Sequence, residues 1–434
     1  MKIALWGYGK YGKKLYRILE EYWKSEYEIV AIYDKNCTEA YVGSILLKSP
    51  DSIADDFVNG DFEGVMISVY WESLFYEILN ALNEYGIPIV RIGNEADFYP
   101  ADAFDTVDDA PFKIDQEGYD FHIFKKIYSI CSLGPLRESI YLFDKAGKLI
   151  ADHWNTFPSK DDFFHKYNYP VRFECHGREI VDFGGDWCVL AKLWSSNYSH
   201  FSYESMDCVC LLEESGFSGK YVINNAPYCK ELMMLYGIAE NRIVTTGELD
   251  PDKVYCFERL FMPKLLKNDK DNSAPVLKRM SDKIKGKLTK DPEHKKYPQL
   301  LYVKRIGSRK LINGDAIASE YGFETIVPDE LPLIEQMNYF HNADIVLSAH
   351  GANSVNGLYM RSGTVIMETF GRTWVNYCHM AAFHENGVYC LPVVEGPIFP
   401  GQRPGKFLDY TIAHTNIDAA MRAAFKLAGI DKNA

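Results

Sequence analysis

The sequence predicts an α/β protein with three doubly wound, Rossmann-like units. Short apolar runs of strand length recur along the 434 residues, and helix-like segments separate them most clearly at both ends of the chain. Strands that alternate with helices form parallel sheets that are covered on both faces. At about 100–200 residues per domain, the length allows two to four domains.

The first unit is expected over residues 1–105, with strands at 2–7, 28–34, 64–70 and 87–93. Gly7, Gly9 and Gly12 form a G-x-G-x-x-G turn between the first strand and a helix, and Asp34 ends the second strand. Such glycines let backbone N–H groups approach a pyrophosphate, and the carboxylate would bind a ribose. NAD is therefore a candidate ligand. The same glycines also let the helix pack closely on its strand with nothing bound.

The second unit is expected over residues 119–290. Residues 141–153 predict a hairpin, much of 186–216 is expected to be helical, and strands are expected at 220–225 and 242–247. The lysine-rich segment 264–296 contains few large apolar residues. Such a segment is typical of a solvated helix or linker, and a peripheral contact with an acidic membrane surface stays open.

The third unit, residues 297–434, has the clearest pattern. Its expected strands are residues 300–305, 323–328, 344–351, 364–370 and 388–394, with a helix at 331–343 between the second and third. This alternation predicts a further parallel sheet, whose ligands would bind at the carboxyl ends of the strands.

The composition favours a cytoplasmic protein. A formal net charge of −13 opposes nonspecific binding to nucleic acid. The N-terminus lacks the pattern of a signal peptide, and no apolar run approaches the roughly 20 residues that span a bilayer. The ten cysteines include no C-x-x-C pair, which argues against a zinc site and a disulfide framework and favours reduced thiols.

One candidate for acid–base chemistry lies in Asn197-Tyr198-Ser199-His200-Phe201, followed by Glu204. His200 and Glu204 are four residues apart and share a face if this segment is helical. The pair would orient a general base, although surface His–Glu pairs at this spacing are common.

Candidate anion-binding residues follow three expected strands of the third unit. Arg305 ends one strand and Arg309 follows in a turn, so their guanidinium groups would grip a diphosphate. His350 ends another strand, and the small residues Gly351, Ala352 and Asn353 would present backbone N–H groups to an anion. Glu368, near the end of a third strand, would accept hydrogen bonds from ribose hydroxyls. These groups converge because they share one end of a parallel sheet.

In their order and spacing these motifs resemble the family 61 glycosyltransferases. The matching segments are NYSHFSYE, YVKRIGSRKLING, the pair Glu335-Gln336, AHGAN and VIMETF, and the resemblance runs from about residue 120 to 395. Two positions depart from the family pattern. Gly314 stands where the family usually has a glutamate, and Asn353 stands where it has a second glycine and would narrow the phosphate turn.

The resemblance implies two Rossmann-like halves in a GT-B arrangement and an inverting reaction without an essential metal. It implies that Glu204 is the base, that His200 orients it, and that Asn197 and Tyr198 lie on the acceptor side. The donor would be a nucleotide-diphosphate sugar, with uridine diphosphate favoured, and the acceptor a glycan or lipid-linked glycan in capsular or extracellular polysaccharide synthesis. The sugar (hexosyl, pentosyl or N-acetylhexosaminyl) and the oligomeric state stay open. The alternatives are an NAD-dependent oxidoreductase acting through the first unit and a non-catalytic sugar-binding scaffold.

Overall fold

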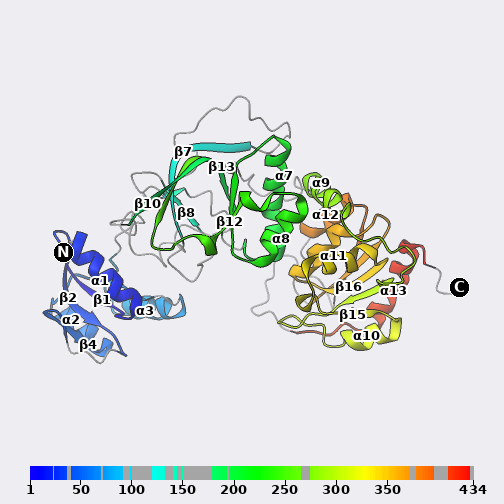
Figure 1. The fold of residues 1–434 in the computed structure, drawn as a ribbon. Coiled ribbons are helices and arrows are strands. Elements are labelled where there is room, and N and C mark those ends of the chain that lie inside the picture. The colour runs from blue at the N-terminus through cyan, green and yellow to red at the C-terminus, as the bar shows by residue number, and fades with distance from the viewer. Residues whose placement is uncertain are drawn as a thin grey trace. The chain divides into compact units, whose positions relative to one another are not determined.

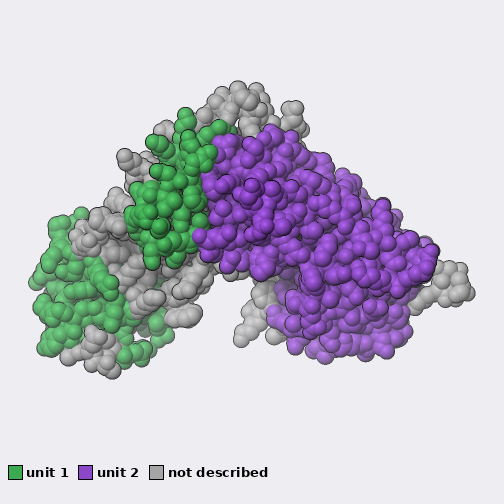
Figure 2. Space-filling view, in the orientation of Figure 1, with its two compact units in different colours: residues 1–107, 123–185, 249–260 green, residues 108–122, 186–248, 261–434 purple. Residues whose placement is uncertain are grey.

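A computed structural model describes residues 1–22, 24–36, 41–69, 72–90, 98–99, 120–131, 140–143, 149–150, 178–192, 195–264, 274–371, 378–394 and 409–430. Three multi-strand sheets, mostly parallel, confirm the α/β class. The chain forms two compact units, residues 1–107, 123–185 and 249–260 and residues 108–122, 186–248 and 261–434 (Figure 2). These units do not coincide with the three expected segments, because the second unit joins part of the middle of the chain to its last third.

The N-terminal sheet has the strand order β3-β4-β2-β1-β5. Apart from the antiparallel β3–β4 pair, its pairs are parallel, which gives the 3-2-1-4 order of half a dinucleotide-binding fold. An isolated parallel bridge from Val65 to Ile89 is the described part of the strand expected at 87–93. The elements are β1 (Lys2–Trp6), α1 (Lys10–Tyr22), β2 (Glu28–Tyr33), β3 (Tyr41–Val42), β4 (Ile45–Lys48), η1 (Pro50–Ser52), α2 (Ile53–Val58), β5 (Gly64–Ile67) and α3 (Glu72–Glu84).

The apolar character of β1 follows from its burial on both faces. Ile3 and Leu5 pack into one cluster with Leu15 and Leu19 of α1. Ala4 and Trp6 face the opposite cluster, which includes residues of α2 and α3. A strand that is covered on both sides reads as a continuous apolar run, as KIALW does.

The rest of the first unit contains antiparallel pairing. β7 (Asp120–Cys131) pairs antiparallel with β8 (Ile140–Phe143), and β8 pairs antiparallel with β9 (Leu149–Ile150), which lies parallel to β6 (Phe98–Tyr99). The strands of the expected hairpin at 141–153 are confirmed, while its turn at 145–148 lies outside the described residues. The connections 132–139 and 144–148 are too short for a crossover helix, so adjacent strands pair antiparallel and this region departs from the expected Rossmann pattern.

A short parallel set begins the second unit. The end of β10 (Ile180–Val189) pairs with β11 (Lys220–Ile223), and β11 pairs with β12 (Ile243–Thr245). Residues 187–189, at the start of a segment expected to be largely helical, are strand because their backbone pairs with β11 and their apolar side chains are buried in the core. The other elements here are α6 (Tyr198–Glu204), α7 (Met206–Glu214), α8 (Pro227–Tyr236), η5 (Glu240–Arg242) and η6 (Thr246–Glu248). The following strand, β13 (Val254–Lys264), belongs to the first unit up to residue 260.

The described part of the lysine-rich segment is a packed helix. α9 (Ala274–Lys285) buries Val276, Leu277, Met280 and Ile284 and contacts α7, α8, α12 and η8. The expectation of a solvated helix or linker was wrong for this face, because apolar residues recur at helical spacing among the lysines. Residues 265–273 lie outside the described residues.

The C-terminal sheet has the order β15-β14-β16-β17-β18, with every pair parallel. Its five strands confirm the five expected from the sequence. In chain order this is the 2-1-3-4-5 arrangement of a doubly wound sheet, whose switch point lies between β14 and β16. The elements are β14 (Leu300–Val303), α10 (Gly314–Tyr321), β15 (Glu324–Ile326), η7 (Pro328–Glu330), α11 (Leu333–Asn342), β16 (Ile345–Ala349), η8 (Ala352–Tyr359), β17 (Val365–Phe370), α12 (Cys378–Glu385), β18 (Tyr389–Val394) and α13 (His414–Ala428).

Helices pack against both faces of this sheet (Figure 1). One face, including Ile345, Leu347, Val365 and Met367, packs into a cluster with residues of α10 and α13.

None of the described helices is long and apolar enough to cross a bilayer. Cysteines 188, 208, 210, 229, 256 and 390 are free thiols.

Candidate functional site

Arg305 lies at the switch point, two residues after β14. Its Nη1 donates to the carbonyl of His350 at 3.4 Å, and its Nε donates to the carbonyl of Ser308 at 2.5 Å. A Cβ atom added at Gly351 would lie 1.7 Å from Nη1 of Arg305. Glycine at 351 is therefore required by the close approach of the guanidinium group, and the structure brings together Arg305, His350 and Gly351 as the sequence predicted.

Arg309 and Tyr410 lie near Arg305. Burial lowers the pKa of Arg309, and the positive charge of Arg305 lowers it further. The Tyr410 hydroxyl donates to the carbonyl of Thr369 at 2.8 Å, and burial raises the pKa of Tyr410 to about 12. Arg309 has φ 64°, a left-handed conformation that is uncommon for a side chain of this size and recurs at functional sites. Two half-buried arginines so close together favour the binding of an anion.

Glu368 has a different position from the one expected. Its side chain is 0% exposed, and its Oε1 lies 2.7 Å from Nδ1 of His350. The ring of His350 also stacks on Phe370, with 4.9 Å between the centroids. The expected contact of Glu368 with a ribose must be revised, because a fully buried carboxylate does not face an open cleft. Its contact with His350 instead fixes the orientation of the imidazole ring.

The turn after His350 opens the 3₁₀ helix η8. The backbone N–H of Ser354 donates to the carbonyl of Gly351, whereas the N–H groups of Ala352 and Asn353 have no acceptor within the described residues. Donors at a helix N-terminus are suited to a phosphate group. Asn353 is half-buried, and the narrowing expected from its side chain stays a prediction.

Close packing explains the glycine at position 314. It is the first residue of α10, and a Cβ atom added there would lie 1.9 Å from the hydroxyl oxygen of Tyr302 in β14. Tyr302 is buried, so its ring cannot move aside without disturbing the core. The close approach of Tyr302 thus leaves no room at position 314 for the glutamate that the resemblance led us to expect.

The segment from Asn197 to Glu204 forms α6, as its spacing predicted. Nδ1 of His200 lies 3.0 Å from Oε1 of Glu204, with the side chains 37% and 19% exposed. Asn197 caps this helix by accepting hydrogen bonds from the backbone N–H groups of Ser199 and His200. Asparagine is a preferred N-cap residue, so helix capping by itself explains why Asn197 stands at this position. The His–Glu pair is accessible enough to meet a substrate.

Tyr198 occupies the interior rather than an acceptor surface. It is 7% exposed, and its hydroxyl donates to Oδ1 of Asn356 in η8 at 2.6 Å. Burial raises its pKa far above the usual value, and Tyr359 and Glu231 raise it further. The expected place of Tyr198 on the acceptor side must be revised, because its polar atom is already used to join α6 to η8.

Two charged groups that the sequence did not single out lie close to Glu204. Lys192 is 8% exposed, and its Nζ donates to the carbonyl of Glu204 at 3.0 Å. Asp207 is also 8% exposed, and burial raises its pKa to about 6 while Lys192 opposes the change. Asp207 lies three residues after Glu204, in the first turn of the next helix α7, and this nearness in the sequence was the available signal.

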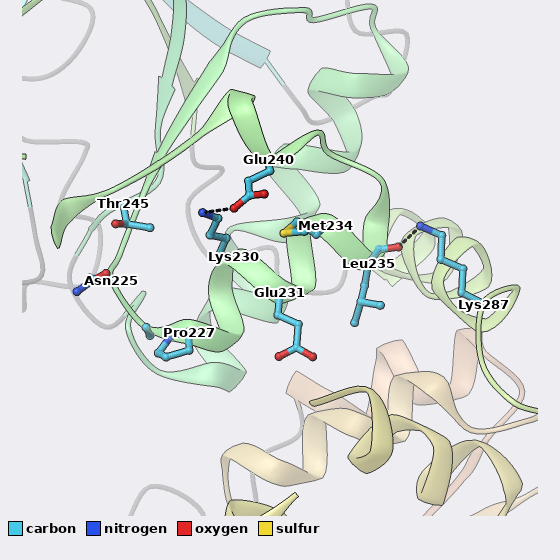
Figure 3. A pocket seen from close by; sticks show the side chains of 10 residues that line it. Asn225, Pro227, Lys230, Glu231, Met234, Leu235, Glu240, Thr245 and Lys287 are labelled. Carbon is cyan, nitrogen blue, oxygen red and sulfur yellow. Dashed lines mark hydrogen bonds and ion pairs between the residues drawn. The ribbon is translucent and has the colours of Figure 1, made fainter. Parts of the chain in front are cut away.

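A cavity of about 630 Å³ lies where β11 and β12 end, beside the start of α8 (Figure 3). Asn225 and Thr245 line it, together with the ion pair of Lys230 and Glu240 at 2.8 Å. Figure 3 also shows Glu231 directed away from that pair, and Glu231 forms no hydrogen bond or ion pair within the described residues. An amide, a hydroxyl and a carboxylate suit the binding of sugar hydroxyls.

The N-terminal glycine turn is built as expected. Gly7 has φ 109°, and a Cβ atom on Gly12 would lie 2.1 Å from the carbonyl oxygen of Gly7, so the helix approaches the turn closely. A Cβ atom on Gly9 would meet nothing within 4 Å. The Asp34 carboxylate accepts the backbone N–H of Tyr8 at 2.5 Å. Close packing explains two of the glycines without a bound dinucleotide.

Tyr410 and Asn356 gave no signal in the sequence. Tyr410 reaches the switch point through an isolated bridge to Leu311, 99 residues earlier, and Asn356 meets Tyr198 across 158 residues. Among the described residues, no group of three or more His, Cys, Asp or Glu side chains is arranged to hold a metal ion.

A family model described as Glycosyltransferase 61 matches residues 159–367, just under half of the chain. This match supports a glycosyltransferase of that family and agrees with the motifs noted in the sequence. The matched range includes α6, Arg305 and the turn after His350, and it ends one residue before Glu368.

A comparison with curated proteins found no match. Among solved structures, the chain is similar to the metal-soaked Flv1 flavodiiron core from Synechocystis sp. PCC6803, at 8% identity over 96% of this chain and 83% of that chain. The TM-score is 0.22, which is too low for this similarity to support any conclusion about the fold or the function.

Proposed function

We propose that this protein is an inverting, metal-independent glycosyltransferase of the GT-B type that uses a nucleotide-diphosphate sugar. The observation that carries the proposal is the close packing of Arg305 on Gly351 at the switch point of the C-terminal sheet. Arg305, Arg309 and the N–H groups of Ala352 and Asn353 would hold the diphosphate, which leaves as the bond from the sugar to its oxygen breaks. We favour uridine diphosphate as the carrier.

Glu204 is the proposed base, and His200, at 3.0 Å, orients it. It takes the proton of the acceptor hydroxyl as that oxygen forms the new bond to the sugar carbon on the face opposite the diphosphate. The cavity lined by Asn225, Thr245 and Glu231 is the proposed site for a glycan or lipid-linked glycan acceptor. The proposed role is cytoplasmic synthesis of a capsular or extracellular polysaccharide, with a peripheral membrane contact left open.

The experiment is a calorimetric titration with uridine diphosphate in buffer that contains a chelator. We expect saturable binding that Arg305→Ala weakens by roughly 1.5–3 kcal/mol, the value of a charge-assisted hydrogen bond. Unchanged affinity in that variant would remove Arg305 from the donor site. Absence of binding to uridine, guanosine, cytidine and thymidine diphosphates would favour the non-catalytic scaffold.

The second candidate is an NAD-dependent oxidoreductase that acts through the N-terminal sheet. The 3-2-1-4 strand order and the open space at Gly9 favour a dinucleotide there. The bond from Tyr8 to Asp34 weighs against it, because that carboxylate is already partly used. A parallel titration with NAD tests this candidate, and Gly9→Val should abolish any binding found.

A further inference from the structure

A second hollow, of about 560 Å³, lies in the second unit between α9, the C-terminal end of α11 and the turn after α12. Four cationic side chains line it, those of Lys278, Lys285, Lys290 and Arg361. The carboxylates that line it belong to Asp282 and Asp291. The hollow thus carries an excess of positive charge, although the whole chain has a formal net charge of −13.

The spacing of α9 produces part of this charge. Lys278, Asp282 and Lys285 recur at intervals of four and three residues, so they share one face of the helix. Asp282 is the partner of Lys278, at 2.5 Å, and lies 3.7 Å from Nζ of Lys285. One carboxylate on this face therefore serves two ammonium groups.

Lys285 is a half-buried cation whose charge is only weakly compensated. Its side chain is 15% exposed, and only Asn386, a neutral amide, accepts a hydrogen bond from it among the described residues, at 2.9 Å. An ammonium group has three N–H donors, so two remain. Burial lowers the pKa of Lys285 to about 8, and the carboxylate of Asp282, at 3.7 Å, only partly opposes this change.

Further positive charge faces Lys285 from the neighbouring elements. Lys290 is exposed and forms no hydrogen bond or ion pair within the described residues. Burial lowers the pKa of His341, and Arg361, Lys285 and Lys290 lower it further. The Asp291 carboxylate is already held by the backbone N–H groups of residues 295–297. The cations repel one another, and a bound anion would relieve that repulsion.

Arg361 connects this charge to α11. Its Nε donates to the carbonyl of His341 at 3.0 Å, and its Nη2 donates to the carbonyl of Asn342 at 2.9 Å and pairs with Asp344 at 2.5 Å. The negative end of the helix dipole is thereby neutralised by a side chain. The C-terminus of α11 consequently opposes an anion less than a bare helix end would.

We propose that this hollow binds a phosphate group, at a site distinct from the proposed donor site. A phosphate offers several acceptor oxygens and up to two negative charges, which matches cations that approach from α9, from the loop at Lys290 and from Arg361. The volume leaves room for the molecule that carries the phosphate. That carrier is either a free phosphorylated molecule or the headgroup of an anionic lipid.

The test is lysine acetylation mapped by mass spectrometry on the full chain carrying Arg305→Ala, so that binding of the probe at the proposed donor site cannot explain the result. Inorganic pyrophosphate is the probe. We expect it to slow acetylation of Lys285 and Lys290 several-fold, because a bound anion covers both amines and raises the pKa of Lys285. Lys295, an exposed lysine of the same loop that pairs with Glu293, should react at the same rate with and without the probe.

Two variants test the site and leave the half-buried Lys285 in place. Lys290→Gln should raise the pyrophosphate concentration for half-protection of Lys285 about fivefold, the value of one exposed charge contact. Lys295→Gln removes the same charge outside the hollow and should leave that concentration unchanged. Equal effects of the two variants, or none from Lys290→Gln, would overturn the proposal.

A second arm distinguishes the two carriers. Protection by pyrophosphate in solution, with none from vesicles of phosphatidylglycerol and phosphatidylcholine, assigns the site to a free phosphorylated molecule. Protection by those vesicles, but not by phosphatidylcholine alone, assigns it to a lipid headgroup and would also explain a membrane contact. If neither pyrophosphate nor the vesicles protect Lys285, the hollow is not a phosphate site. No arm depends on glycosyl transfer, so failure here leaves the proposed function untouched.

Discussion

The hydroxyl of Tyr198 donates a hydrogen bond to Oδ1 of Asn356 at 2.6 Å, with both residues buried. Tyr198 opens α6, which carries His200 and Glu204, and Asn356 lies in η8, which begins at the turn after His350. The bond therefore connects the helix of the proposed base to the helix of the proposed phosphate turn.

Tyr198→Phe should reduce the free energy of unfolding by about 1–3 kcal/mol, because it leaves the Asn356 carbonyl buried without its donor. Denaturant unfolding measures this change. A double-mutant cycle with Asn356→Ala should give a coupling energy of about 0.5–3 kcal/mol. Strictly additive losses would mean that the bond does not stabilise the contact of α6 with η8.

Gly351→Ala should weaken binding of the donor diphosphate about as much as Arg305→Ala does, roughly 1.5–3 kcal/mol. The added methyl would lie 1.7 Å from Nη1 of Arg305 and must displace the guanidinium group. Gly307→Ala is the matched control, since a Cβ atom there meets nothing within 4 Å. Calorimetry on the three variants checks this, and full affinity in Gly351→Ala would contradict the assignment.

Glu204→Gln should lower kcat for transfer by about 10²–10⁴ while the donor dissociation constant stays unchanged, as expected when a general base is lost. Asp207→Asn is the comparison, because its carboxylate is buried 3 positions along the chain from Glu204. Single-turnover transfer assays separate the two. If Asp207→Asn abolishes transfer and Glu204→Gln does not, Asp207 is the general base in place of Glu204.

Asp207 should also make stability depend on pH. Its folded pKa is raised from 3.8 to about 6, so its stabilising contribution is complete below the unfolded pKa and is lost as the pH rises through the folded pKa. From about pH 4 to pH 7 the wild type should lose up to about 3 kcal/mol relative to Asp207→Asn. Unfolding curves of both proteins across this range measure the difference, and parallel pH profiles would rule out the shift.

Glu231→Gln should raise the KM for the acceptor several-fold and leave donor affinity unchanged, since Glu231 lines the cavity assigned to the acceptor. Glu330→Gln, an exposed change of the same kind in η7, is the control. Initial-rate kinetics at saturating donor give the comparison. An unchanged acceptor KM would move the acceptor away from this cavity.

Much of the proposed site could be predicted because its residues follow local patterns. Arg305 and His350 each follow an apolar run of strand length, and parallel strands bring such positions to one edge. His200 and Glu204 meet because their spacing matches a helical turn. The hairpin of β8 and β9 was predicted, but the antiparallel pairing of β7 with β8 was missed because the expectation for this region rested on alternation and not on the short connection between these strands.

The sequence by itself determined the five strands of the C-terminal sheet, β1, β2 and β5 of the N-terminal sheet, the glycine turn at the N-terminus and the motifs that match a transferase family. It gave no sign of β3 and β4. The tertiary structure alone decided that β14 and β16 flank the switch point, that Glu368 faces His350 from the interior, and that Tyr410 reaches the arginines. The physical reason is the separation along the chain of the residues that interact. Periodicity and spacing record what neighbours along the chain do, whereas burial and long-range contacts depend on which surfaces meet when the chain packs.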